Sequence, residues 1–160
     1  MSVYAKEKSA LTKVREALKL QLAKIKRVDG YFSDLGKVYD DFPANPEDIQ
    51  DRVAVVPVFG YEKTERFDNE TLDILMLAYL IVYVKPTGSA TEAIEAITAD
   101  IQSVLGNNWM LPGEDGLPTC QSCWYFSAEP FGKVLDRPQA GVKLGFKILY
   151  QQYFSDPTQT

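Results

Sequence analysis

Two segments of the chain place apolar residues at steps of three and four, which is the spacing of an amphipathic helix. The first segment runs from about Ser9 to Val28, and Asp29-Gly30 ends it. Its apolar positions are Leu11, Val14, Leu18, Leu22 and Ile25. We therefore predict a helix here, with one side packed on the rest of the domain.

The second helical segment is SATEAIEAITADIQSVLG, which follows Gly88. Ser89 as the N-cap and Glu92 at the third helical position form a capping box. Gly106 occupies the position where a C-terminal cap belongs. The narrow apolar stripe consists of Ile94, Ile97, Ile101 and Val104 or Leu105. We expect this stripe to lie on a sheet.

The remaining apolar segments have the patterns of strands. Short extended segments are predicted at 36–42 and 53–61, separated by the polar loop PANPEDIQD. Pro57 cannot donate to a strand ladder, so it should lie at an edge or a bulge. The polar residues 62–70 are predicted to form a hairpin connection. Two further strands are predicted at 119–129 and over the alternating residues Val142, Leu144, Phe146, Ile148 and Tyr150.

The longest apolar run, Thr71 to Val84, is predicted to be a strand with two apolar faces. It is too short to span a membrane, which takes about 20 apolar residues. One face carries Leu72, Ile74, Met76, Ala78, Leu80, Val82 and Val84. The other face carries Leu75, Leu77, Tyr79, Ile81 and Tyr83. Both faces need cover, and a small domain usually supplies cover for only one.

Together these elements predict an α+β domain with two helices packed on one face of a mainly antiparallel β-sheet, in the order α-β-β-β-α-β-β and with an extended hairpin. We expect one domain over 1–155 and a short tail over 156–160. The second apolar face of the long strand would then lack a partner within the chain. Because large exposed apolar faces mark interaction sites, another chain is its expected partner.

Charge is distributed unevenly along this chain of 160 residues. Residues 1–27 carry eight basic and two acidic side chains, a balance of +6. The net charge of −5 therefore leaves −11 for the remainder. A basic helix on an acidic body can bind nucleic acid, an anionic surface or an acidic patch on another copy, or it can be a solvated helix face. The N-terminus lacks the apolar segment of a signal peptide, so we expect synthesis inside the cell and no membrane association.

Few residues offer catalytic chemistry, so we expect no enzyme, no metal site and no cofactor. The chain contains no histidine, which excludes histidine bases and ligands. Cys120 and Cys123 have no further cysteine or histidine to complete a zinc site, and an odd separation in a strand would point their thiols to opposite faces. They are predicted to be small buried residues rather than a redox pair.

Two other groups of residues have a functional and a structural interpretation. Asp40, Asp41, Glu47, Asp48 and Asp51 could form a cation site or a carboxylate catalyst, but their spacing matches no calcium loop and favours a solvated turn. Trp109 and Trp124 could stack on bases. Without neighbouring basic residues, we expect them to be core or interface anchors.

Five segments taken in order resemble a known family. They are LKLQLAKIKRVDGYFSDLGKVYDDF, VAVVPVFGYE, LDILMLAYLIVYV, ATEAIEAITADIQSVL and AGVKLGFKILYQQY. Over nearly the full chain, this pattern resembles the tail terminators, or tail-completion proteins, of tailed bacteriophages. The resemblance implies a domain of two helices against an antiparallel sheet. It also implies a homo-oligomeric ring, typically a hexamer, that stops growth of the tail tube and provides the docking surface for the head or neck connector.

The resemblance further implies a virion protein that is assembled in the host cytoplasm. Its implied partners are other copies of itself, the tail tube protein, the sheath protein where one is present, and the connector, while genomic DNA passes through the lumen without sequence-specific binding. The interface is predicted on the basic residues Lys13, Lys19, Lys24, Lys26 and Arg27 and on the second face of the long strand, at Leu75, Leu77, Tyr79, Ile81 and Tyr83. Segments 62–70 and 107–118 are candidate contact loops.

Two alternatives belong to other functional classes. The first is a small nucleic-acid-binding module that uses the basic N-terminal helix on phosphates; the acidic remainder of the chain argues against it. The second is a carboxylate- and metal-dependent enzyme built on the segment from Asp40 to Asp51. A steep loss of DNA affinity with salt would support the first, and a thermal shift with magnesium or manganese would support the second.

Overall fold

The fold was analysed in a computed structural model that describes residues 9–40, 49, 52–67, 71–85, 88–131 and 140–153. The side chains of 61–67 and 153 are outside this description. The elements in chain order are α1 (Ala10–Leu22), a 3-10 turn (Arg27–Asp29), β1 (Lys37–Val38), β2 (Val53–Phe67), β3 (Thr71–Val84), α2 (Ala90–Asn107), β4 (Ser122–Phe131) and β5 (Ala140–Tyr153). The predicted tail 156–160 lies outside the described residues.

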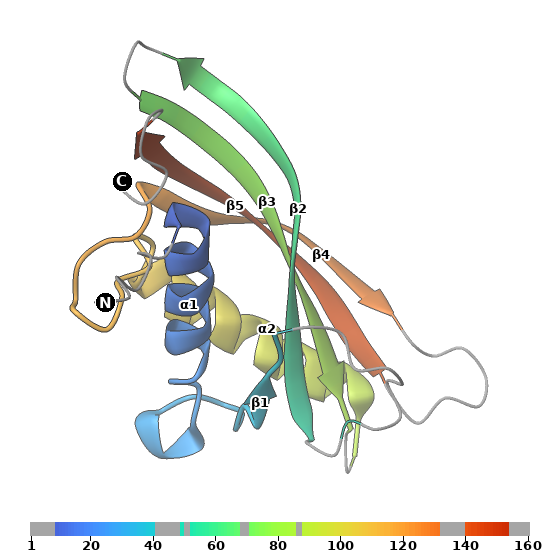
Figure 1. Ribbon diagram of the computed structural model, residues 1–160. Coiled ribbons are helices and arrows are strands. Elements are labelled where there is room, and N and C mark those ends of the chain that lie inside the picture. Colours follow the sequence, from blue (N-terminus) through green and yellow to red (C-terminus); the bar gives the residue numbers. More distant parts are fainter. Residues whose placement is uncertain are drawn as a thin grey trace, which may run out of the picture.

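The five strands form one sheet in the order β1-β2-β3-β5-β4. β1 pairs with β2 in parallel, and the other three pairings are antiparallel. Both helices lie on the same face of this long, twisted sheet (Figure 1). The predicted α+β architecture, with two helices on one face of a mainly antiparallel sheet, is confirmed.

The core lies between the helices and the even-numbered residues of β3. Ile74, Met76, Ala78, Leu80, Val82 and Val84 are buried there, and they pair with β5 residues that are also buried. The alternation predicted for β5 is confirmed, since Val142, Leu144, Phe146, Ile148 and Tyr150 all belong to this core. The helix stripes close it from the other side, through Val14 and Leu18 of α1 and Ile97 and Ile101 of α2.

The first helix is shorter than its periodicity predicts. It begins after Ser9, whose hydroxyl accepts a hydrogen bond from the Thr12 amide at 3.2 Å, but it ends at Leu22 instead of Val28. The next amides bond three residues back, Lys24 to the Gln21 carbonyl and Ile25 to the Leu22 carbonyl. This tighter turn keeps Ile25 buried, so the apolar periodicity continues after the α-helix has ended.

The second helix begins as predicted, because the Ser89 hydroxyl accepts from the Glu92 amide at 3.3 Å. The prediction that Gly106 caps its C-terminus is wrong. The helix continues through Asn107, and Asn108 is the C-cap, with φ −127° and ψ 43° rather than a left-handed backbone. Gly106 lies exposed within the last turn.

Two strand predictions also need correction. Residues 62–67 are not part of the predicted hairpin connection, because their backbone pairs with β3 as part of β2. The β2–β3 register shifts between Phe59 and Glu62 and between Thr64 and Arg66. Of the segment predicted as a strand over 36–42, the described residues 36–40 contribute Lys37 and Val38, and 41–42 lie outside the described residues. Because β1 pairs with Ala54 and Val55, Pro57 lies beyond it, where no described strand pairs with this side of β2, as its missing N–H requires.

Candidate interaction surface

The face of the sheet opposite the helices is largely apolar and partly exposed. We call it the back face and define it by Leu75, Leu77, Tyr79, Ile81 and Tyr83 of β3, by Gly141, Lys143, Gly145, Lys147 and Leu149 of β5, and by Trp124, Phe126, Glu129 and Phe131 of β4. All five β3 residues are half-buried, whereas their neighbours in the strand, Ile74 to Val84, point into the core. Both helices lie on the other side of the sheet (Figure 1).

The back face is closed near β2 and open toward β4. Ala54 and Val56 share its side of the sheet through their register with Tyr83 and Ile81, yet both are fully buried. On β4, by contrast, Trp124, Phe126 and Phe131 remain 40%, 38% and 37% exposed. The open part of the back face therefore spans β3, β5 and β4.

Two glycines of β5 allow aromatic rings to cross the strand. A Cβ atom at Gly141 would lie 2.2 Å from the Val82 carbonyl oxygen and 2.5 Å from the ring of Phe131. At Gly145, a Cβ atom would lie 2.7 Å from the ring of Phe126. The β4 rings thus reach across β5 to β3, and each meets a tyrosine edge-to-face. The ring centroids of Phe126 and Tyr79 are 6.1 Å apart, and those of Phe131 and Tyr83 are 5.8 Å apart.

Two lysines lie among these rings. The Lys143 ammonium is 4.3 Å from the ring centroid of Tyr79, and the Lys147 ammonium is 5.4 Å from that of Phe126. Both geometries are those of cation–π interactions. Glu129 stands opposite Lys143 in the β4–β5 register. The open back face therefore combines aromatic rings with two cations and one carboxylate.

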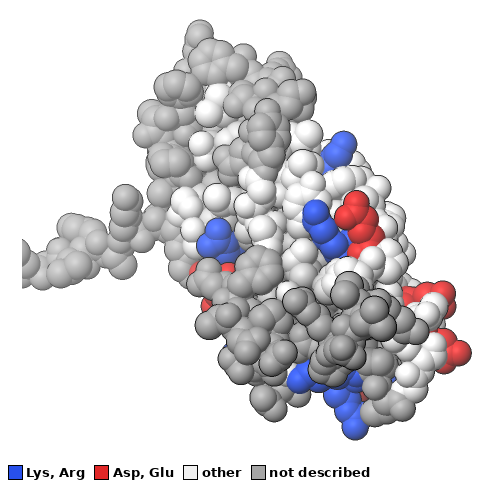
Figure 2. Space-filling view, turned by 90° about the vertical axis from the view of Figure 1, so that its right-hand side faces the viewer, with Lys and Arg blue, Asp and Glu red and all other residues white. Residues whose placement is uncertain are grey.

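Figure 2 views the molecule from the right-hand side of Figure 1, the side away from the helices. In the part not drawn grey, the surface is mostly white, with separate blue and red groups at its margins and a few within it. Burial raises the pKa of the Tyr83 hydroxyl above its ordinary value, because the surrounding side chains exclude water from part of this face. Such a mixed aromatic and charged surface is typical of a protein–protein contact.

The basic residues predicted as interface do not form one helical face. Only Lys13 and Lys19 lie on α1, because the helix ends at Leu22. Lys19, Lys24, Lys26 and Arg27 all contact their own chain. Lys19 pairs with Asp40 at 2.5 Å, Lys24 donates to Gln21 Oε1 at 2.6 Å, Lys26 donates to the Leu35 carbonyl, and Arg27 Nε donates to the Phe32 carbonyl at 3.1 Å. Their interface role stays a prediction, while these contacts weaken the nucleic-acid alternative.

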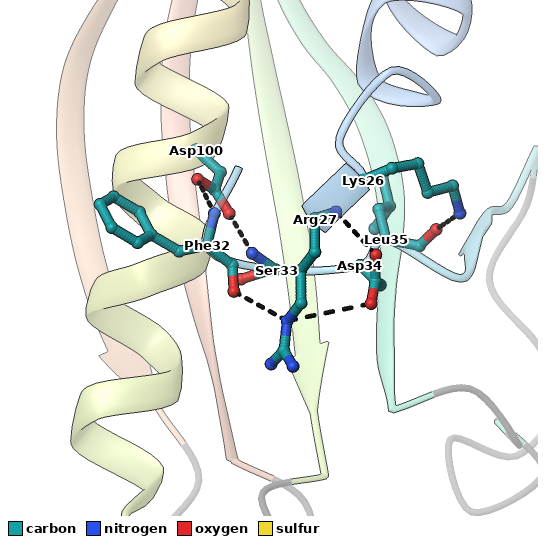
Figure 3. Close-up of polar contacts among 7 residues, drawn as sticks. All are labelled: Lys26, Arg27, Phe32, Ser33, Asp34, Leu35 and Asp100. Atoms are coloured by element: carbon teal, nitrogen blue, oxygen red, sulfur yellow. Dashed lines mark hydrogen bonds and ion pairs between the residues drawn. The ribbon is translucent and has the colours of Figure 1, made fainter. Parts of the chain in front are cut away.

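The loop after α1 is held in place by an acidic residue that the sequence analysis did not single out. Asp100 of α2 is buried, and its two carboxylate oxygens accept the amides of Phe32 and Ser33 at 2.9 and 2.8 Å (Figure 3). On the other side of the loop, the Arg27 amide donates to Asp34 Oδ1 at 2.8 Å (Figure 3). The braced loop exposes two apolar side chains, Val28 at 91% and Phe32 at 70%.

The predicted contact loop 107–118 also exposes apolar side chains. Leu117 is 63% exposed, and Trp109 and Met110 are less so. The loop is anchored to α1 by the buried Gln21, whose amide donates to the Pro112 carbonyl at 2.8 Å. Trp109 and Trp124 are 46% and 40% exposed, so of the two predicted roles, core or interface anchor, the core role does not apply and the interface role stays a prediction. Residues 68–70 of the other predicted loop lie outside the described residues.

Cys120 and Cys123 are free thiols within the same core cluster. The prediction that they point to opposite faces is wrong, because β4 begins at Ser122 and Cys120 precedes its alternation. Burial raises the pKa of each thiol to about 12. This is the opposite of the lowered pKa of a reactive cysteine, so the predicted buried, unreactive role is consistent with the geometry.

Of the acidic segment, only Asp40 is described, while Asp41, Glu47, Asp48 and Asp51 lie outside the described residues. Asp40 is exposed, and its hydrogen bond and charge interaction with Lys19 hold the pKa of its carboxyl below the ordinary value. Within the described ranges, no three histidine, cysteine or acidic side chains gather in a way that could hold a metal ion. The described helices are too short or too polar to cross a membrane.

No protein-family model matches the chain, and no curated protein matches it. Among solved structures, the chain is similar to one chain of the virion of a native gene transfer agent particle. The two are 17% identical, the match covers 94% of this chain and 99% of that chain, and the TM-score is 0.46. A likeness at this identity and TM-score does not establish a common fold or function.

Proposed function

We propose that this protein is a structural virion component that assembles into a ring, most simply a hexamer, at the head-proximal end of a phage tail tube. There it ends tube polymerisation and provides the docking surface for the head or neck connector. The observation that carries the proposal is the open back face, where half-exposed Leu, Ile and Tyr side chains of the central strand β3 adjoin the exposed rings of β4. A surface of this kind is expected to be covered in the working assembly.

The arrangement of the layers supports the proposed ring. The helices cover one face of the sheet and the back face points the other way (Figure 1). A copy that covers the back face of its neighbour with a different surface leaves its own back face open for the next copy. Such heterologous contacts close into a ring when the rotation per subunit allows it, and they otherwise give open filaments.

The remaining roles follow from the sequence pattern shared with tail terminators. We assign no catalytic role and no cofactor to the chain. Its proposed partners are the tail tube protein, the sheath protein in contractile tails, and the connector. Genomic DNA would pass through the lumen without sequence-specific binding. The exposed loops that carry Phe32 and Leu117 are the proposed contacts to these other proteins, because each is rigidly braced and presents an apolar side chain.

Light scattering coupled to size exclusion, over a concentration series and followed by negative-stain imaging, tests this proposal. We expect a single large species with a central hole wide enough for duplex DNA. A monomer at the highest concentration, or a closed dimer in which the two back faces meet, would contradict a ring built from heterologous contacts. Addition of magnesium or duplex DNA serves as the control for the two alternative functions, since neither should change the size of the species.

A further inference from the structure

The side of α2 that faces away from the sheet has an unusual composition. Its exposed residues recur at steps of three and four along one line of the helix, which we call the outer stripe: Glu92, Glu95, Ala99, Ser103 and Gly106. The N-terminal half of the stripe carries two carboxylates, and the C-terminal half carries only small residues. The whole helix, ATEAIEAITADIQSVLGN, contains no lysine or arginine.

The charge of the outer stripe complements that of the back face. The stripe contributes two negative charges, whereas the open back face presents the ammonium groups of Lys143 and Lys147, with Glu129 beside only the first of them. Complementary charges of this kind select a partner surface and its orientation. The match therefore points to a second copy of the chain as the occupant of the back face.

The side-chain sizes of the two surfaces are complementary as well. On the back face, the rings of Trp124, Phe126 and Phe131 remain partly exposed. On the outer stripe, Ala99, Ser103 and Gly106 have no side chain longer than a hydroxymethyl group. A helix with small residues at its contact surface lets bulky rings approach its backbone closely, which increases the apolar area removed from water.

We propose that the outer stripe of α2 in one copy docks on the open back face of the next copy, between β3 and β4. This inference rests on the proposed ring and specifies its subunit contact. Because the helix layer and the back face lie on opposite sides of each copy, every subunit gives one surface and receives the other. The contact is therefore heterologous, and one pair of surfaces is sufficient to build the whole ring.

Charge reversal on each surface tests this contact. The first variant, Lys143→Glu/Lys147→Glu, should repel the outer stripe of a neighbouring wild-type α2. The second variant, Glu92→Lys/Glu95→Lys, should repel a wild-type back face. Each variant alone is expected to assemble about tenfold more weakly or worse than the wild type, because like charges then face each other at every contact. Glu92 and Glu95 are exposed, whereas Lys143 and Lys147 are half-buried beside aromatic rings, so circular dichroism checks that each variant is folded.

The decisive experiment mixes equal amounts of the two double variants. Every contact between unlike copies then pairs opposite charges, so assembly should return, with the two variants in a 1:1 ratio and an even number of subunits. As a control of matched charge change, Lys37→Glu is compared with Lys147→Glu alone. Lys37 is exposed on β1, at the edge of the sheet opposite β4, and belongs to neither surface, so its reversal should leave assembly unchanged.

Each other outcome would overturn the proposed contact. If both double variants assemble like the wild type, or if their mixture fails to assemble, then α2 does not dock on the back face, although the ring itself would stand. If Lys37→Glu weakens assembly as much as Lys147→Glu, the effect is one of net charge and not of this contact. If the wild-type chain forms no assembly, both the contact and the ring fail.

Discussion

At the residue scale, the back face depends on two positions where any side chain would collide with its surroundings. The nearest atom to a Cβ at Gly141 is a backbone carbonyl oxygen of β3, which cannot rotate away as a side chain can. The rings of Phe131 and Phe126 take the space that side chains at Gly141 and Gly145 would fill. The glycines therefore fix how close β3, β5 and β4 come together and where the aromatic rings stand.

Gly141→Ala should accordingly destabilise the fold by about 1–3 kcal/mol, the usual cost of overpacking, or by more if the strands must separate. Gly106→Ala is the matched control. Nothing lies within 4 Å of a Cβ at Gly106, which is in helix α2, so this change should stabilise the protein by about 0.5–1 kcal/mol. Urea unfolding of the two variants and the wild type measures both effects. Equal stabilities for the two variants would contradict the packing described here.

The cysteines give a second prediction at this scale. Burial raises the pKa of both thiols from 9.0 in the unfolded chain to about 12 in the fold. Below pH 9 the thiols are protonated in both the folded and the unfolded chain, so the free energy of unfolding does not change through their titration. Between pH 9 and about 12 the unfolded thiols lose protons that the folded ones keep, so stability should fall, by up to about 1.4 kcal/mol per pH unit for each thiol.

Thiol labelling measures the same property directly. At pH 8 a thiol-specific reagent should modify Cys120 and Cys123 slowly in the folded protein and rapidly in urea, because reaction requires an exposed thiolate. Cys123→Ala should remove one of the two slow sites and reduce the loss of stability above pH 9. Rapid labelling of both thiols without denaturant would show that they are not buried as described.

At the scale of elements, the sequence pattern was most reliable where a single period determines burial. The bounds of β3 follow from its unbroken apolar run, the faces of β5 follow from alternation, and the stripe of α2 follows from its helical spacing. The pattern was wrong at the ends of elements. Helix α1 stops at Leu22 although the apolar spacing continues to Ile25, because a turn with hydrogen bonds from Lys24 to Gln21 and from Ile25 to Leu22 still directs Ile25 into the core. Residues 62–67 join β2 because backbone pairing with β3 does not depend on apolar side chains.

The contact between the braced loop and α2 could not have been predicted from the pattern. Asp100 looks like a polar position in an amphipathic helix, and no local signal indicates that the amides of Phe32 and Ser33, 68 and 67 residues away, will bind it. Only the three-dimensional arrangement brings the two elements together. The same holds for the back face, whose openness was predicted from β3 but whose aromatic and lysine contacts arise from the register of β4 with β5.

Asp100→Asn tests how strongly that contact holds the loop. The amide keeps the shape of the side chain but replaces one accepting oxygen by a donor that would face an amide N–H. Removing one of the two hydrogen bonds should cost about 1–3 kcal/mol of unfolding free energy and should speed hydrogen exchange at Phe32 and Ser33. Glu95→Gln, an exposed change of the same charge on the same helix, should leave both quantities nearly unchanged. Unaltered exchange in Asp100→Asn would show that the loop is held by other contacts.

At the scale of the whole molecule, one sheet separates two different surfaces. One face is sealed by α1 and α2, and the other is open over β3, β5 and β4 (Figure 1). In the proposed ring, this asymmetry provides each copy with a donor side and an acceptor side, as heterologous contacts require. We therefore expect the back face to become covered when copies of the chain meet.

Lysine acetylation followed by mass spectrometry, at concentrations below and above assembly, measures this cover most directly. Lys143 and Lys147 report on the back face, and the exposed Lys37 of β1, at the opposite edge of the sheet from β4, serves as an internal reference. We predict that assembly protects Lys143 and Lys147 from acetylation while Lys37 continues to react at an unchanged rate. If all three lysines react equally in the assembled and the dilute protein, the back face is not the contact between copies.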